Sequence, residues 1–505
     1  MPTGAIREAA AEWAAEIGHH GWHFPAIRAQ REAQVSDLLV SSREHPQVRH
    51  PLSLADNHRY LVDRDGRPFL LVGDAGWSIL VSATREEAVK YLDDRASRGF
   101  NAILVNLLEY YFSPDPPRNR YGEAPFTIPG DFSTPNPAYF DHARWVLERA
   151  AERNILVLLC VCYLGYHDAG WPGPTSWNEG WFGEVMKNGF DRCRAYGRFV
   201  GESFGDLDNL IWVMGGDADP GSALVSIGQM AEGIKKADPR HLMTAHCAPE
   251  SSPVDEYRGE RWLDLNNTYT YEIVHAHLYE DYHRVPPSPT WLMEAAYENE
   301  HTTSEVQLRR QAYWSVLRGG FGHTFGCTPI WHFGKGWETS LDGPGSRGMT
   351  RFAEAFRDMP WWKLVPEAAP SVSWDPRLQG PKLLLSGHGE ARGLDFCSIA
   401  RTADGRLAMA YMPTARKLTL DASVLAGPTV RLKWFDPIRG GWRDGGERNS
   451  GTPIEVEPPG EQDWLLAIES ALEWLGPTWT RSSPRPSGRG ARGSSSRELP
   501  ARGAS

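Results

Sequence analysis

Long apolar runs are missing from this chain, and so is any pattern of paired cysteines. No stretch approaches the ~20 apolar residues that a membrane-spanning helix needs, so we expect no membrane contact. Six cysteines in 505 residues show no paired framework, which argues against a disulfide scaffold and for buried, reduced thiols. The first residues are charged and helix-like and lack the apolar core of a secretory signal. The sequence therefore favours a cytoplasmic protein, or an exported one if the true start codon lies elsewhere.

Positive charge is also in short supply, because 53 Lys and Arg face 64 Asp and Glu, for a formal net charge of -11. A nucleic-acid-binding protein needs a basic surface, so nucleic acid is not an expected partner. The tail at residues 471–505 is basic, rich in Arg, Ser, Gly and Pro, and poor in the apolar residues that would order it. We expect this tail to be disordered.

The motifs of several well-known sites are absent as well. The chain has no Walker-type phosphate loop, no CxxC pair and no HExxH. The turn from Gly73 to Gly76 does not match the glycine fingerprint of a dinucleotide-binding fold. A metal site made of Asp217, His246 and His323 has no ligand spacing to support it. We therefore expect neither a cofactor nor a metal.

What the chain does contain is a regular alternation of apolar segments and helical patterns between residues 51 and 360. This alternation is typical of a (β/α)8 TIM barrel, an α/β fold with parallel strands buried on both faces. The expected strands span residues 68–74, 101–106, 155–163, 209–217, 241–246, 262–266, 290–294 and 322–326. Helix start signals stand between them, such as Thr84 with Glu87 and Thr302 with Glu305.

The sequence changes character after residue 360. Residues 361–470 form short alternating segments separated by Gly, Pro and Asp, which is typical of a small antiparallel β-sandwich. Residues 1–50 read as an N-terminal helical extension. The expected order is therefore a helical extension at 1–50, a barrel at 51–360, a β-sandwich at 361–470 and a basic tail at 471–505.

Two expected strands end in carboxylates. The fourth ends at Gly215, Gly216 and Asp217, and the seventh ends at Glu294. In a parallel barrel the carboxyl ends of the strands build the active site, and positions four and seven lie across the mouth from each other. We therefore predict Asp217 and Glu294 as a catalytic pair. The alternatives are a helix N-cap role for Asp217 and the use of Glu298, one turn later, in place of Glu294.

Other polar and aromatic residues at or near strand ends are candidate substrate-binding groups. Packing in the core or support of the site is the alternative for each. Tryptophan is abundant, with 21 Trp against 17 Tyr and 18 Phe, and flat indoles suit the apolar faces of sugar rings. The candidates are Asp74, Trp77, Asn106, His246, Asn266, Tyr269, Glu298, His323 and Trp331.

Four segments resemble the apiosidase-like glycoside hydrolases in sequence and order: residues 73–77, 211–217, 294–298 and 322–326. Residues 361–366 and 434–437 are similar to the collagen-binding-type β domain that follows the barrel in that family. The resemblance implies a glycosidase acting on an oligosaccharide or glycoconjugate, with Asp217 and Glu294 as the catalytic pair. By analogy with related barrels, Asp217 is the expected acid/base and Glu294 the expected nucleophile or base, with retention of configuration favoured.

A function from another class stays open at this point. A carbohydrate-binding or scaffold protein on a degenerate barrel would keep the aromatic residues of the mouth and lose a carboxylate. Both carboxylates are present in this chain, which favours the enzyme. Composition leaves the oligomeric state open.

Overall fold

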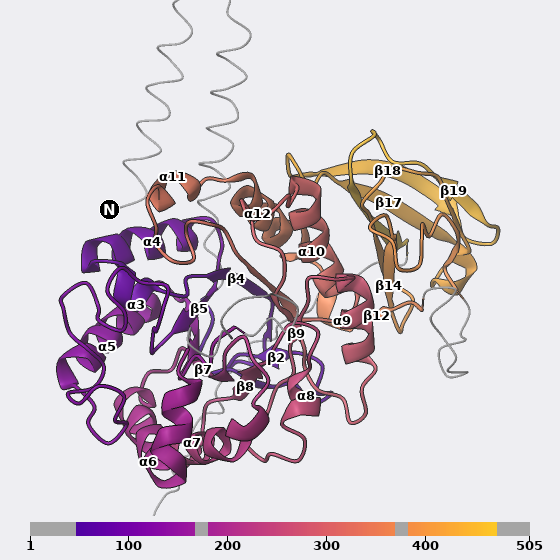
Figure 1. The fold of residues 1–505 in the computed structure, drawn as a ribbon. Helices are drawn as coiled ribbons and strands as arrows, with labels where there is room; N and C mark the ends of the chain where they lie inside the picture. The colour runs from indigo at the N-terminus through magenta and orange to yellow at the C-terminus, as the bar shows by residue number, and fades with distance from the viewer. Residues whose placement is uncertain (1–46, 167–179, 369–381, 472–505) are drawn as a thin grey trace, which may run out of the picture.

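The computed structural model describes residues 47–166, 180–368 and 382–471 of the chain. A barrel of strands ringed by helices comes first, and a domain of antiparallel strands packs beside it (Figure 1). The predicted helical extension, through residue 46, and the predicted disordered tail, from residue 472, lie outside the described residues. Within those residues, no helix has both the length and the apolar character needed to cross a membrane.

A small antiparallel sheet precedes the barrel. Its strands are β1 (Ser53–Leu54), β2 (Leu61–Val62) and β3 (Pro68–Phe69). The strand predicted over residues 68–74 is therefore two strands, because β3 pairs with β2 and the first barrel strand, β4, spans Leu71–Ala75.

Eight parallel strands form the barrel, as the sequence predicted. In sheet order they are β8 (Met243–His246), β7 (Leu210–Gly215), β6 (Leu156–Cys160), β5 (Ala102–Asn106), β4, β11 (Gly322–Phe325), β10 (Leu292–Glu294) and β9 (Thr268–Tyr269). The seam between β8 and β9 is bridged by the Asp264 N–H, which donates to the Met243 carbonyl at 2.9 Å. The Asn267 side chain also donates across it, to the Ala245 carbonyl at 2.6 Å.

The strand predicted over residues 262–266 is wrong. The N–H groups of Asp264 and Leu265 both donate to one carbonyl, that of Met243, at 2.9 and 3.2 Å. Two successive donors on one acceptor make a bend, since a parallel ladder spreads its bonds along both strands. The sixth strand of the barrel is instead β9, which follows this bend and is only two residues long.

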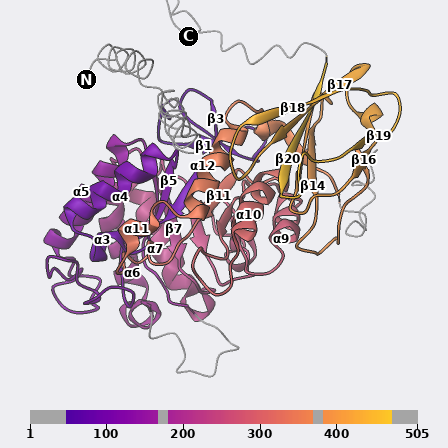
Figure 2. The same ribbon diagram turned by 90° about the horizontal axis from the view of Figure 1, so that it is seen from above.

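Helices surround the barrel and cover its strands (Figures 1 and 2). They are α3 (Ile79–Ser82), α4 (Arg85–Ser97), α5 (Pro137–Glu152), α6 (Phe182–Phe204), α7 (Leu224–Ala237), α8 (Pro253–Glu256), α9 (Val274–Tyr282), α10 (Glu305–Leu317), α11 (Trp337–Ser340) and α12 (Pro344–Phe356). The predicted capping box of Thr84 and Glu87 is confirmed at α4. The predicted pair Thr302 and Glu305 is wrong, because Ser304 caps α10 by accepting from the Gln307 N–H.

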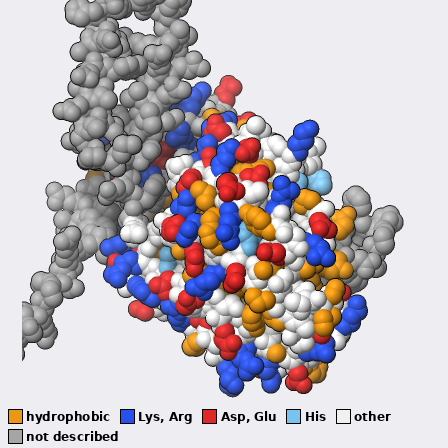
Figure 3. All heavy atoms as spheres, turned by 90° about the vertical axis from the view of Figure 1, so that its left-hand side faces the viewer, with side chains coloured by type: hydrophobic (Ala, Val, Ile, Leu, Met, Phe, Trp, Pro, Cys, Tyr) orange, Lys and Arg blue, Asp and Glu red, His pale blue; other side chains and the backbone are white. Residues whose placement is uncertain are grey.

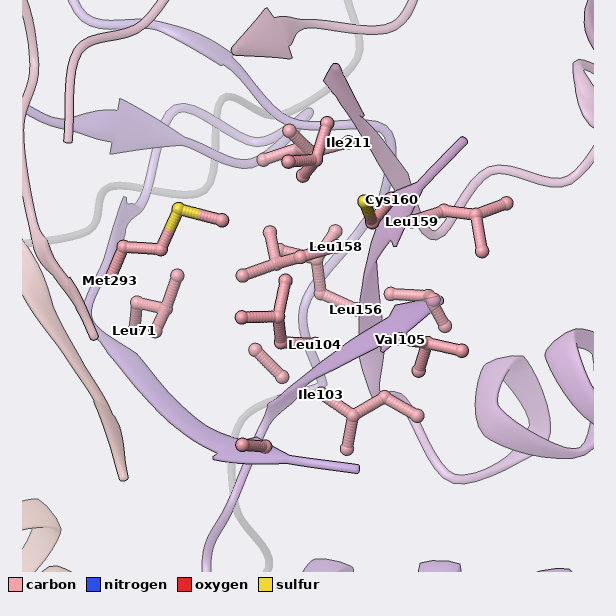
Figure 4. Close-up of a cluster of buried hydrophobic side chains, with 14 of the residues drawn as sticks. Leu71, Ile103, Leu104, Val105, Leu156, Leu158, Leu159, Cys160, Ile211 and Met293 are labelled. Atoms are coloured by element: carbon pink, nitrogen blue, oxygen red, sulfur yellow. The ribbon is translucent and has the colours of Figure 1, made fainter. Parts of the chain in front are cut away.

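Side chains fill the barrel interior. Figure 4 shows part of this core, where Leu71 from β4, Leu104 from β5, Leu158 from β6 and Met293 from β10 belong to one buried cluster. Each of these four residues has no more than a trace of exposed surface. Because the interior is packed, the barrel offers a substrate the ends of its strands and not its inside.

The C-terminal domain is a sandwich of two antiparallel sheets, as predicted. One sheet holds β12 (Leu364–Pro366), β14 (Ser398–Thr402), β15 (Leu407–Met412), β20 (Trp464–Ser470), β17 (Thr429–Phe435) and β18 (Trp442–Asn449). The other holds β13 (Leu384–Ser386), β16 (Leu418–Leu420) and β19 (Ile454–Val456). Apolar residues from both sheets share one core.

The sandwich is fixed to α10 of the barrel. Arg309 of α10 forms a two-pronged ion pair with the buried Asp463, at 2.9 and 2.8 Å. Tyr411 of β15 donates to the same carboxylate at 2.9 Å and stacks on Tyr313 of α10 with ring centres 4.7 Å apart. Since the partners of the buried charges are supplied by both domains, the contact is specific in orientation.

Lysine, arginine and carboxylate side chains are intermixed on the face of the barrel that Figure 3 presents. Neither sign of charge gathers over the described residues visible in that view.

Candidate active site

The turn after β7 delivers Asp217 to the mouth of the barrel. Gly215, Gly216 and Asp217 have φ values of +78°, +139° and +54°, so the chain leaves the strand in a tight turn. That turn wraps around His246 at the end of β8. The Gly216 N–H donates to the His246 carbonyl at 2.8 Å, and the Asp217 N–H donates to His246 Nδ1 at 2.7 Å. Asp217 is not a helix cap, since α7 begins at Leu224.

Gly216 has no room for a side chain, which yields a first prediction. A Cβ there would stand 2.6 Å from a ring carbon of Tyr163 and 2.9 Å from its Cα. We expect Gly216→Ala to destabilise the protein by about 1–3 kcal/mol and to displace Tyr163 from Asp217. Thermal unfolding and kcat/KM measure the two effects. The matched control is Gly221→Ala, where φ is +47° and no atom lies within 4 Å of the new Cβ. Equal melting temperatures and rates for the two variants would contradict the prediction.

A β-bulge aims Glu294 at the same mouth. Leu292 pairs with Thr268, and Glu294 pairs with the next residue, Tyr269, so Met293 is an extra residue in β10. Met293 lies in the barrel interior (Figure 4). In a regular strand the residue after an inward side chain points outward. The bulge breaks that alternation and turns Glu294 inward beside Tyr269.

Hydrogen bonds hold the two carboxylates in place. Tyr163 donates to Asp217 Oδ2 at 2.8 Å, and Tyr269 donates to Asp217 Oδ1 at 2.9 Å. His246 Nε2 lies 2.8 Å from Glu294 Oε2. One oxygen of Asp217 and one of Glu294 lie within 4.8 Å of each other. The residues predicted as a pair from distant parts of the chain therefore meet.

Burial and a neighbouring negative charge make Glu294 harder to ionise than a free glutamate. Burial, followed by the negative charge of Asp217, raises the pKa of Glu294 to about 7. The Glu294 side chain is 7% exposed, and that of Asp217 is 18% exposed. Because two carboxylates this close resist ionising together, the pair holds one proton near neutral pH.

Asp217, His246 and Glu294 together also have the composition of a metal site, with one ligand atom of each within 4.8 Å of the others. The imidazole does not fit that use. Its Nδ1 lone pair accepts the Asp217 N–H, so the ring proton is on Nε2, which points at Glu294. Neither nitrogen has a free lone pair for an ion. The predicted absence of a metal stays a prediction.

Several predicted substrate-binding residues join this site. The Trp77 ring meets His246 edge-on at 5.4 Å, and its Nε1–H donates to the Tyr297 hydroxyl at 3.0 Å. Tyr269 stacks on His246 at 4.9 Å. Asn106 ends β5 and is 2% exposed, and its Oδ1 has no hydrogen-bond partner among the described residues.

An aromatic group lies next to the pair. Phe112 contacts the predicted residue Trp331, with ring centres 5.0 Å apart, and Tyr163, at 5.8 Å. The Trp331 Nε1–H donates to Glu300 Oε1 at 3.0 Å. Trp331 is therefore linked through Phe112 to Tyr163, which donates to Asp217, and its role in substrate binding stays a prediction.

Four predicted residues are placed elsewhere. Asp74 faces α4 and accepts from Tyr91 and Arg95, and Asn266 accepts from Ser252 behind β9. Glu298 accepts the Gly345 N–H at the start of α12. His323 pairs with Val72 on the face of the sheet that carries Asp74, and its Nδ1 lies 3.3 Å from the Leu292 carbonyl. Burial lowers the pKa of His323 to about 4, as expected of a neutral core histidine.

Three tyrosines belong to the site and were not predicted: Tyr163, Tyr271 and Tyr297. Tyr163 follows β6 by a few residues, so the position of strand ends could have indicated it. The hydroxyl oxygens of Tyr271 and Tyr269 are 3.1 Å apart, and Tyr271 is 47% exposed. Tyr297 hydrogen-bonds Glu294 from the loop after β10, where strand periodicity gives no signal.

The barrel and the sandwich each match a family of known proteins. Residues 55–363 match the family described as "Apiosidase-like, catalytic domain", and residues 385–469 match "Putative collagen-binding domain of a collagenase". No curated protein matches the chain.

Solved structures show the same fold. A structure titled "Glycoside hydrolase" aligns with a TM-score of 0.71 at 23% identity, covering 84% of this chain and 98% of its own. A glycoside hydrolase family 5 structure from Bacteroides vulgatus ATCC 8482 aligns with a TM-score of 0.71 at 22% identity, covering 84% of this chain and 94% of its own.

Proposed function

The chain belongs to the apiosidase-like family of glycoside hydrolases, and from that premise we propose that Asp217 and Glu294 cleave the glycosidic bond together. The proposal rests on one observation above all. Two carboxyl groups from opposite strands present oxygens within 4.8 Å of each other, beside an aromatic mouth. Glycoside hydrolysis needs one carboxyl to protonate the leaving oxygen and another to attack the anomeric carbon or activate water.

The directions of the hydrogen bonds support different roles for the two. The Asp217 N–H can only donate, so His246 Nδ1 accepts and Nε2 donates to Glu294. Indole N–H groups likewise only donate, so the Tyr297 hydroxyl accepts from Trp77 and has its proton free for Glu294. The Nε2–H of His246 is a fixed donor to Glu294, and such a donor stabilises a carboxylate. We assign Glu294 as the nucleophile.

Asp217 is bonded by hydroxyl groups, which can turn. When Asp217 is protonated, its carboxyl O–H can donate a hydrogen bond to the hydroxyl of Tyr163 or Tyr269, whose oxygens are 2.8 and 2.9 Å away. Placing the shared proton on Asp217 also removes the negative charge that opposes ionisation of Glu294. We assign Asp217 as the general acid, which becomes the general base in the second step.

Separation of the carboxyl groups bears on stereochemistry. Retaining glycosidases hold them about 5–5.5 Å apart, whereas inverting enzymes need roughly 6.5–9.5 Å to fit a water molecule between carboxylate and sugar. Oxygens within 4.8 Å favour the retaining arrangement. The substrate class we propose is a glycan or glycoconjugate whose sugar packs against the aromatic side chains of the mouth.

The stereochemistry is the second prediction. We expect the first-formed sugar to have the anomeric configuration of the substrate, because a covalent intermediate on Glu294 requires two inversions. A panel of aryl glycosides and plant-wall oligosaccharides, including apiose- and arabinose-containing ones, identifies a cleaved substrate. Proton NMR during the first minutes then records the product anomer before it equilibrates. First appearance of the opposite anomer would show an inverting enzyme. Binding without turnover across the panel would favour a carbohydrate-binding protein instead.

A further inference from the structure

His246 connects the two proposed catalytic residues directly. It is fully buried at the end of β8, and its two ring nitrogens have different neighbours. Nδ1 is 2.7 Å from the Asp217 backbone nitrogen, and Nε2 is 2.8 Å from Glu294 Oε2. The side chain therefore spans the gap between the proposed acid and the proposed nucleophile.

The backbone decides which nitrogen carries the proton. An amide N–H is an obligatory donor, so the lone pair of Nδ1 must face it and the proton must be on Nε2. The amide is aimed by the left-handed turn through Gly215, Gly216 and Asp217. Added side chains are excluded from both glycines, because a Cβ on Gly215 would stand 2.7 Å from the His246 carbonyl oxygen and one on Gly216 would meet Tyr163. The turn cannot easily relax away from the ring.

Charges around the ring pull it toward the imidazolium form. Burial disfavours a charged ring, but the hydrogen bond to Glu294 and the charge of Asp217 raise the net pKa of His246 above its usual value. Two aromatic rings also contact the imidazole: Tyr269, stacked at 4.9 Å, and the edge of Trp77. A second proton, however, would have to sit on Nδ1, facing the Asp217 N–H at 2.7 Å. Two hydrogens cannot share that distance, so geometry opposes the charged form.

We propose that His246 is a positioning residue that stays neutral, with its Nε2–H tautomer fixed by the Asp217 backbone, and holds the carboxylate of Glu294 for attack. This inference rests on the proposed roles of Asp217 and Glu294. Loss of the Nε2–H donor leaves Glu294 with one fewer hydrogen bond to its ionised form. The ionised nucleophile then becomes harder to form, although nothing that touches the sugar has been removed.

The direct test is the tautomer of the wild-type ring, which needs no turnover. In protein labelled with 15N-histidine, the His246 signals are assigned by their loss in His246→Gln. From about pH 5 to about pH 8, we expect one nitrogen protonated and one not, with no titration between them. A ring that becomes doubly protonated in this range, or one with the proton on Nδ1, would overturn the proposal.

Two substitutions separate positioning from packing. In His246→Gln the amide oxygen can accept and the amide nitrogen can donate, so we expect kcat/KM within about tenfold of wild type. The acidic and alkaline limbs of the plot of kcat/KM against pH should be unchanged. In His246→Ala we expect kcat/KM to fall roughly 10²-fold and the acidic limb to move up by about one pH unit. His323→Gln is the matched control, a buried barrel histidine outside the site. It should change stability without moving a limb.

The results also distinguish this inference from the proposed function. If Glu294→Gln is inactive but His246→Ala leaves the acidic limb in place, Glu294 is catalytic and the positioning role is wrong. If Glu294→Gln keeps its activity, the proposed function fails, while the tautomer remains measurable. A lower melting temperature for His246→Ala with unmoved limbs would assign His246 to packing alone.

Discussion

Glu294→Ala is expected to lower kcat/KM by on the order of 10⁴-fold or more, because the proposed covalent step loses its nucleophile. The shortened side chain leaves a space beside the anomeric carbon that a small anion can enter. With an activated aryl glycoside and added azide, we expect turnover to return and a glycosyl azide of inverted configuration to form. NMR of the isolated azide establishes the face of attack.

Glu298→Ala is the matched control for this experiment. It removes a carboxylate four residues away, in the loop that follows β10, and that carboxylate accepts the Gly345 N–H at 2.8 Å at the start of α12. We expect lower stability from the lost helix contact, but retained turnover and no azide product. A glycosyl azide from Glu298→Ala, or near wild-type rates for Glu294→Ala, would transfer the role away from Glu294.

The barrel could be predicted from sequence because its strands and helices carry strong local signals. The apolar segments over 101–106, 155–163 and 209–217 each became a strand, and the capping box at Thr84 began a helix. The sixth strand was misplaced for an equally physical reason. Residues 262–266 are apolar enough for a strand, but the N–H groups of Asp264 and Leu265 both donate to the Met243 carbonyl and form a bend. The strand is formed instead by Thr268 and Tyr269, which follow the bend.

Side-chain direction explains why some predicted residues lie in the site and others do not. Asp74 and Asp217 both follow a glycine at the end of an apolar run, yet they have opposite fates. Asp74 is still inside β4, where alternation turns it outward to Arg95 of α4. Asp217 lies beyond β7, after two glycines with positive φ. Both apolar runs are followed by the same Gly-Asp pair in the sequence, and only the strand boundary separates the two cases.

The bulge at Met293 was equally hidden. Simple alternation along β10 would send either Met293 or Glu294 into the barrel, but not both. The extra residue opposite β9 lets Met293 fill the core while Glu294 reaches the mouth. A bulge depends on the partner strand, so a single segment of sequence does not reveal it. The position of Glu294 at the mouth was predicted from the resemblance and from the strand end, neither of which depends on which way the side chain faces, and its catalytic role stays a prediction.

Asp217→Ala is expected to produce a loss that depends on the leaving group. For sugars linked to ordinary alcohols, kcat/KM should fall about 10²–10⁴-fold, because the departing oxygen is no longer protonated. For an activated aryl glycoside the first step needs little proton transfer, so the loss should be much smaller. Added azide should then give a glycosyl azide of retained configuration, opposite to the product from Glu294→Ala.

The pH profile supplies an independent readout of the same variant. Burial, followed by the negative charge of Asp217, raises the pKa of Glu294 to about 7. This pKa therefore describes the step in which the pair of carboxyl groups loses its last proton. Wild-type kcat/KM should therefore fall as the pH rises through about 7, when no acid remains, and this alkaline limb should vanish in Asp217→Ala.

Asp219→Ala is the control for both measurements. Asp219 lies two residues away and accepts from the Ala248 N–H and the Ser251 hydroxyl at 3.1 and 3.0 Å, so it serves the loop. It should keep the alkaline limb and give no azide product. If Asp217→Ala instead yields the inverted azide, the two carboxylates have exchanged roles. The hydrogen-bond directions around Glu294 would then not determine which residue holds the proton in the complex with substrate.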